Sequence, residues 1–65
     1  MTLSNDAVAY WLACHDMRHG DPERRPMAAH NLIQIGTRDD DGPVTVRARK
    51  QINEAAGVLA MFDAA

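Results

Sequence analysis

Cysteine and aromatic residues are scarce in this chain, and their scarcity limits how it can be stabilised. Cys14 is the single cysteine among 65 residues, which excludes an internal disulfide. With one tryptophan, one tyrosine and one phenylalanine, the core must rely on aliphatic residues, methionine and alanine. A chain of this length buries only about 60% of the surface that its unfolded form exposes, so its stability is marginal. We therefore expect oligomerisation, as a homodimer, to supply part of the stability.

The sequence also lacks a long apolar run and an excess of basic residues. Nowhere do about 18 apolar residues follow one another, so we expect no membrane-spanning helix and no membrane partner. The first six residues do not resemble a secretory signal, and with the lone cysteine this favours a cytoplasmic protein. A formal net charge of −2 argues against strong, non-specific nucleic-acid binding. The bias toward alanine and arginine suggests a bacterial or phage source.

Apolar residues do recur at helical spacing in the C-terminal third. Steps of four and three residues align six side chains along one face of a helix: Val44, Ala48, Ile52, Ala55, Leu59 and Phe62. We predict one long amphipathic helix over 44–62. A helix this long in so small a chain must bury its stripe against the N-terminal half or against another chain.

A first helix is predicted from about Asn5 to His19. Ser4, Asn5 and Asp6 are all favourable N-cap residues, and Gly20 is expected to end the helix in a left-handed conformation. The face assigned to the core contains Val8, Trp11, Leu12 and His15. The opposite face is also partly apolar, which indicates a second contact and includes Tyr10, Ala13 and Met17.

The middle of the chain allows two interpretations. A short helix from Pro26 to about Gln34, followed by the acidic loop 37–43, gives an all-α three-helix domain over residues 1–65. Alternatively, 32–35 and 44–47 pair as a short hairpin at about 32–49, which gives an α-β-β-α fold. The apolar stripe favours three helices, with the first and last packed antiparallel and the short helix across one end. The predicted core contains Val8, Trp11, Leu12, Ile52, Leu59 and Phe62.

Two histidines have a spacing that suits a metal ion. His15 and His19 lie at i and i+4 on one helix face, and a second helix that folds back would bring His30 near them. Neither Cys14 nor Asp16 shares that face, which weakens the site. We keep a metal-binding module as the third functional hypothesis.

No pattern indicates catalysis. The sequence contains no glycine-rich phosphate loop, no paired-carboxylate motif and no triad pattern, and Cys14 has no predicted base on its helix face. We therefore expect a protein that is not an enzyme and needs no cofactor.

A basic cluster near the start of the long helix supports a second hypothesis. Arg47, Arg49 and Lys50 would form the basic start of a third helix, a layout similar to that of helix-turn-helix DNA readers in general. The preceding aspartates, 39–41, would repel a phosphate backbone. The basic cluster supports a small dimeric DNA-binding regulator, and the aspartates make this the second functional hypothesis and not the first.

Surplus apolar surface supports the leading hypothesis, a small regulatory or inhibitory protein that binds another protein through helix faces. The predicted apolar contacts are Tyr10, Met17, Met61 and Phe62. The predicted polar contacts at the rim are Arg47 and Arg49.

Overall fold

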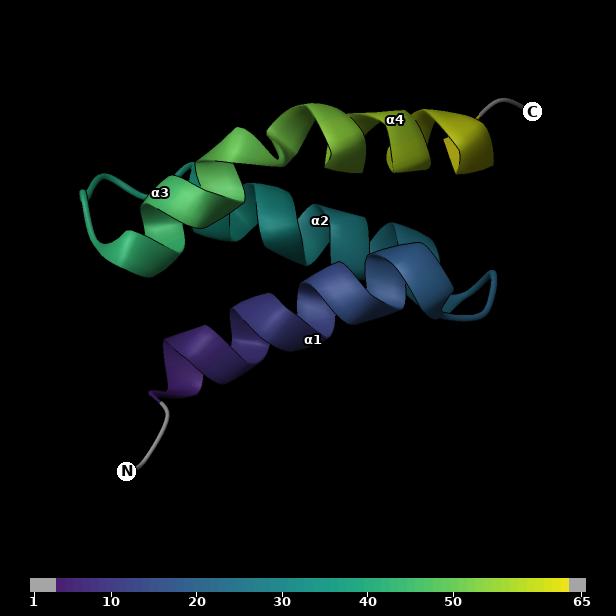
Figure 1. The fold of residues 1–65 in the computed structure, drawn as a ribbon. Coiled ribbons are helices and arrows are strands. Elements are labelled where there is room, and N and C mark those ends of the chain that lie inside the picture. Colours follow the sequence, from purple (N-terminus) through teal and green to yellow (C-terminus); the bar gives the residue numbers. More distant parts are fainter. Residues whose placement is uncertain (1–3, 64–65) are drawn as a thin grey trace.

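Four α-helices and no β-strand are present within residues 4–63, the part of the chain that the computed structural model describes (Figure 1). They are α1 (Asn5–His19), α2 (Arg24–Gly36), α3 (Pro43–Lys50) and α4 (Ile52–Asp63). The prediction of an all-α protein is confirmed. The α-β-β-α alternative finds no support, because its two proposed strands lie in α2 and α3.

The central helix is α2. It packs against each of the other three helices and lies between α1 and α4, which meet each other at few points (Figure 1). The predicted antiparallel packing of the first helix against the last is therefore wrong. The main link between them is an ion pair in which Arg18 donates two hydrogen bonds, of 2.8 and 2.9 Å, to the Glu54 carboxylate. This contact lowers the pKa of Glu54.

The predicted long helix over 44–62 is divided at Gln51, which makes four helices instead of three. The Gln51 N–H donates to the Ala48 carbonyl, three residues back, at φ −107° and ψ 8°. The Gln51 side chain meanwhile bonds to Tyr10 and Cys14 of α1. Apolar spacing continues through the break because only one residue departs from helical geometry, so the pattern does not reveal it.

Hydrogen bonds from side chains and backbone cap the start of α1 and the connection between α1 and α2. Of the three candidate N-cap residues of α1, Ser4 takes the role, and its side chain accepts from the Ala7 N–H. Gly20 is extended, at φ −70° and ψ 168°, and not left-handed as predicted; a Cβ atom there would lie 2.5 Å from the Asp16 carbonyl oxygen. Asp21 accepts from two backbone N–H groups at the start of α2. The helix α2 therefore begins at Arg24, before Pro26. Proline is tolerated at this third position because a backbone N–H there would have no partner within the helix.

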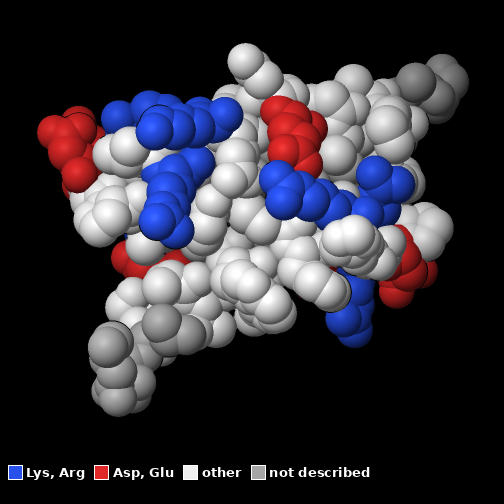
Figure 2. Space-filling model, viewed as in Figure 1, with Lys and Arg blue, Asp and Glu red and all other residues white. Residues whose placement is uncertain are grey.

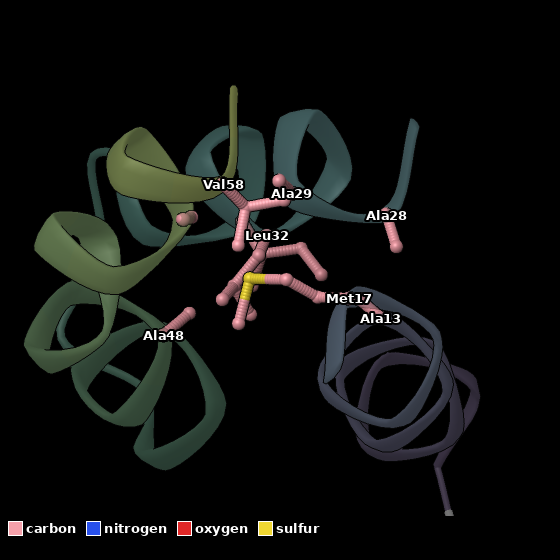
Figure 3. Packing of buried hydrophobic residues seen from close by; sticks show 9 residues of the cluster. Ala13, Met17, Ala28, Ala29, Leu32, Ala48 and Val58 are labelled. Atoms are coloured by element: carbon pink, nitrogen blue, oxygen red, sulfur yellow. The ribbon is translucent and has the colours of Figure 1, made fainter. Parts of the chain in front are cut away.

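The core lies where all four helices meet. Figure 3 shows Met17, Leu32 and Val58 pointing toward one another, from α1, α2 and α4. The complete cluster is Ala13, Met17, Ala28, Ala29, Leu32, Ile35, Ala48, Ala55 and Val58. Most of these side chains are alanines, which let helices approach closely but bury little apolar area each.

The face of α1 that packs inward is the opposite of the one predicted. Ala13 and Met17 are buried, whereas Trp11 is 62% exposed and Leu12 is 47% exposed. Val8 and Phe62 are exposed too, so most of the predicted core is wrong; Ile52 and Leu59 are half-buried. Close packing explains the reversal, because the alanine-rich side of α2 approaches closely and small or unbranched side chains fill the space there better than indole.

Within residues 4–63, no helix combines the length and the apolar character needed to cross a bilayer.

Candidate functional site

Six large apolar side chains remain exposed on the described part of the protein. They come from α1, α2 and α4: Val8, Trp11, Leu12, Met27, Met61 and Phe62. Exposed apolar patches on a small protein are typical of contact sites for other molecules. The surfaces around Trp11, around Met27 and at the end of α4 are therefore the candidates.

Tyr10 and Trp11 form a ridge between two shallow grooves. One groove, of about 260 Å³, lies between α1 and α3 and is lined by Ala7, Tyr10, Trp11, Pro43, Val44 and Arg47. The other, of about 310 Å³, is lined by Tyr10, Trp11, Cys14, His15, Arg18, His19 and Gln51. We use the name Trp11 face for Tyr10, Trp11, His15, His19, Val44 and Arg47.

Aromatic rings along α1 hold Trp11 in place. The Trp11 and His15 rings are stacked, with centroids 5.4 Å apart and planes 21° apart. His19 continues the row, with its centroid 5.4 Å from that of His15. A side chain that is already ordered loses less conformational entropy when a partner covers it. The row therefore restricts the conformations that are open to the Trp11 side chain.

A hydrogen-bond chain across the helices holds the other half of the ridge. Cys14 Sγ donates to Gln51 Oε1 at 3.0 Å, and Gln51 Nε2 donates to the Tyr10 hydroxyl. Burial raises the pKa of Tyr10 above its ordinary value, and the neighbouring Cys14 raises it further. The neutral phenol is thus favoured in the folded state.

This raised pKa predicts a loss of stability in alkali. The contribution of Tyr10 is complete below pH 10.0, the ordinary tyrosine value, and is lost as the pH rises through the higher pKa of the folded state. Urea unfolding measured on both sides of that pH is expected to show a decline that Tyr10→Phe reduces. Because Tyr10 is the single tyrosine, its phenolate absorbance also reports the pKa directly. An apparent pKa at or below the ordinary value would contradict this assignment.

The structure separates the predicted partner contacts. Tyr10 and Arg47 line the same groove. Met61 and Phe62 lie near the C-terminal end of α4, where the Arg25 guanidinium is 5.6 Å from the Phe62 ring centroid. Met17 is fully buried in the core and is not available to a partner.

Arg49 fastens the loop between α2 and α3. Its Nε donates to the Gly36 carbonyl at 3.2 Å, and its Nη2 donates to the carbonyls of Arg38 and Asp40 at 3.2 and 3.3 Å. The guanidinium that was predicted as a rim or phosphate contact is thus already engaged within the chain. Of the other two residues of the predicted basic cluster, Arg47 lines the groove between α1 and α3, and Lys50 is exposed.

An acid occupies the start of α3. The Asp40 carboxylate accepts from the Gly42 N–H at 2.9 Å, and hydrogen bonds from Thr45 and Gly42 lower the pKa of Asp40. Figure 2 shows basic side chains gathered over α3 with acidic ones beside them at the loop. A phosphate that approached the N-terminus of α3 would meet this negative charge.

The three predicted metal ligands do not come together. His15 and His19 are neighbours on α1, but His30 lies on α2 and shares a 3.1 Å hydrogen bond with Gln34. Within residues 4–63, no group of three or more histidine, cysteine or acidic side chains is close enough to hold a metal ion.

A third and larger groove, of about 650 Å³, runs between α1 and α2, and we call it the α1/α2 groove. Its lining is Ala9, Leu12, Ala13, Asp16, Arg24, Met27, Ala28, Asn31, Gln34, Ile35 and Arg38. Sequence reasoning missed both this groove and the exposure of Trp11. The two apolar faces of the first helix were the available signal, and they were assigned in reverse.

No protein-family model, no curated protein and no solved structure matches this chain.

Proposed function

We propose that this protein is a non-enzymatic regulator or inhibitor that acts by binding another protein through its helix faces, with the Trp11 face as the principal contact. The observation that carries the proposal is the 62% exposure of Trp11 on a ridge flanked by two grooves. A large indole left in solvent contributes little to the fold, whereas tryptophan is enriched among the residues that dominate binding energy at interfaces.

The surroundings of Trp11 suit such a contact. Stacking on His15 and the Gln51 bond to Tyr10 fix the ridge before a partner arrives. Arg47 lies at the edge of the adjoining groove and supplies a charged rim. The exposed Met61 and Phe62 at the end of α4 form a separate secondary contact in this proposal.

The proposal includes a homodimer. Small chains without disulfides or metal ions commonly gain stability by association. The core of this chain consists largely of alanine, while larger apolar side chains stay exposed. Burial of some of these side chains between two copies would correct that imbalance.

Trp11→Ala tests the proposed contact without damaging the fold. Because the side chain is mostly exposed, the free energy of unfolding is expected to change by no more than about 1 kcal/mol, as chemical denaturation measures. Binding to the target, in contrast, is expected to weaken by roughly 30-fold, or about 2 kcal/mol. Titration calorimetry on a target captured from a lysate of the source organism measures this loss.

Met61→Ala, which truncates an exposed apolar side chain of the secondary contact, is the comparison variant and is expected to weaken binding less than Trp11→Ala. Capture is carried out with and without nuclease, and at low and high salt. Unchanged affinity for Trp11→Ala would contradict the Trp11 face. Capture that requires nucleic acid and falls steeply with salt would instead support the DNA-binding alternative through Arg47 and Lys50.

A further inference from the structure

We propose that the occupant of the α1/α2 groove is a second copy of this chain, related by a two-fold axis that runs along the groove. The inference rests on the homodimer in the proposed function and adds the surface and the pairing. The groove and the Trp11 face share no residue, which leaves the ridge free for a different partner. They adjoin on α1, where an oxygen of Asp16 lies 3.5 Å from His15 Nδ1.

The floor and walls of the groove suit helix packing. Its lining includes the small side chains of Ala9, Ala13 and Ala28, of which the last two are buried, and small side chains permit close approach of another helix. Leu12 and Met27 stand at its walls and are 47% and 68% exposed. Two copies placed face to face would bury both of these side chains twice.

Charged side chains on the two sides of the α1/α2 groove favour a second copy as the occupant and favour one orientation of it. The α1 wall carries the acid Asp16, and the α2 wall carries the base Arg24 at the same end of the groove. Among the described residues, the ion pair of Arg24 is a loose one, with its Nε 3.9 Å from an oxygen of Asp21. The two walls of one groove therefore have opposite charge, so the surface is complementary to a rotated copy of itself.

A two-fold axis along the groove places α1 of one copy over α2 of the other. Asp16 then faces Arg24 of the partner subunit, and the symmetry repeats this pair. At the other end of the groove Arg38 is already paired with Asp6 at 2.8 Å, with the acid again from α1. Because α1 and α2 run in opposite directions, every neighbouring pair of helices in the dimer is antiparallel, as in a four-helix bundle.

The test is a charge exchange followed by sedimentation velocity over a range of concentrations. Asp16→Arg and Arg24→Asp each turn both predicted pairs into like-charge contacts within a homodimer. Each variant alone is expected to associate at least about tenfold more weakly than the wild type. An equal mixture of the two variants restores both pairs and is expected to recover a heterodimer.

These substitutions are suited to the fold. Asp16 lies near the C-terminal end of α1 and Arg24 at the start of α2, so each new charge is favourable toward the dipole of its helix. Circular dichroism checks that both variants are helical. Lys50→Asp makes the same change in charge as Arg24→Asp outside the groove and is expected to leave association unchanged.

Three results would overturn the proposal. A wild-type chain that is monomeric at every concentration excludes the homodimer as well as this site. A wild-type dimer that neither variant weakens leaves the homodimer but places it on another face. Two weakened variants that do not recover in the mixture contradict the Asp16–Arg24 pairing. None of these results bears on the Trp11 face, whose failure is seen only in target binding.

Discussion

Met17→Ala is expected to unfold a large fraction of the molecules at room temperature. Met17 is fully buried where α1, α2 and α4 meet, and truncation leaves a cavity among side chains that cannot close over it (Figure 3). Such substitutions cost about 2–5 kcal/mol. Natural domains have roughly 0.05–0.15 kcal/mol of stability per residue, so a chain this small has little to spare. Thermal unfolding followed by circular dichroism measures the loss.

Met61→Ala is the matched control, because it removes the same atoms from a side chain that is 61% exposed. Its unfolding free energy is expected to stay within about 0.5 kcal/mol of the wild type. Both variants are compared at one protein concentration, since association would otherwise shift the midpoint. Equal stability of the two variants would mean that Met17 does not hold the core.

Alanine substitution at two helical glycines is expected to change stability in opposite directions. A Cβ atom at Gly36 would lie 2.9 Å from the Arg49 backbone nitrogen and 3.0 Å from the Ala48 carbonyl carbon. Backbone cannot rotate away as a side chain can, so α3 must shift from α2 or the helix must distort. The expected loss is about 1–3 kcal/mol.

Gly57 provides the contrast, because a Cβ atom there meets nothing within 4 Å. Gly57→Ala therefore gains helix propensity without a clash and is expected to stabilise the protein by about 0.5–1 kcal/mol. Urea unfolding of both variants gives the two changes. If Gly36→Ala were stabilising as well, the close approach of α2 and α3 would be wrong.

The position of Gly36 also shows why α3 ends up beside α2. Gly36 is buried at the end of α2, and Arg49 reaches back from α3 to its carbonyl. Both features depend on residues that are distant in sequence. The sequence predicts a helix end at about Gln34, close to the observed end at Gly36, but it does not show that a second backbone passes close by.

Several elements could be predicted from local sequence because local chemistry determines them. The N-cap at Ser4 needs only a hydroxyl near free N–H groups, and α1 spans the predicted residues, 5–19. The acidic loop before Pro43 and the helical character of 44–62 likewise follow from turn residues and spacing. The break at Gln51 does not, since it accompanies hydrogen bonds to Tyr10 and Cys14 of another helix.

The candidate site was predicted only in part. Tyr10 and Arg47 were named as contacts and do share a groove, whereas Met17 is in the core and Arg49 is bonded to three carbonyls. Trp11 was placed in the core because it shares a helix face with Val8 and Leu12. Helix spacing tells which residues share a face, but it does not tell which face turns inward.

The sequence by itself therefore determined the helical class, most helix ends and the surplus of apolar surface, because these depend on residues near one another in the chain. Tertiary structure alone decided that α2 is central, that Met17 instead of Trp11 is buried, and that acid and base line opposite walls of one groove. The physical reason is that close packing between residues distant in sequence decides which helices are neighbours. The alanine faces leave room only for side chains that fit against them.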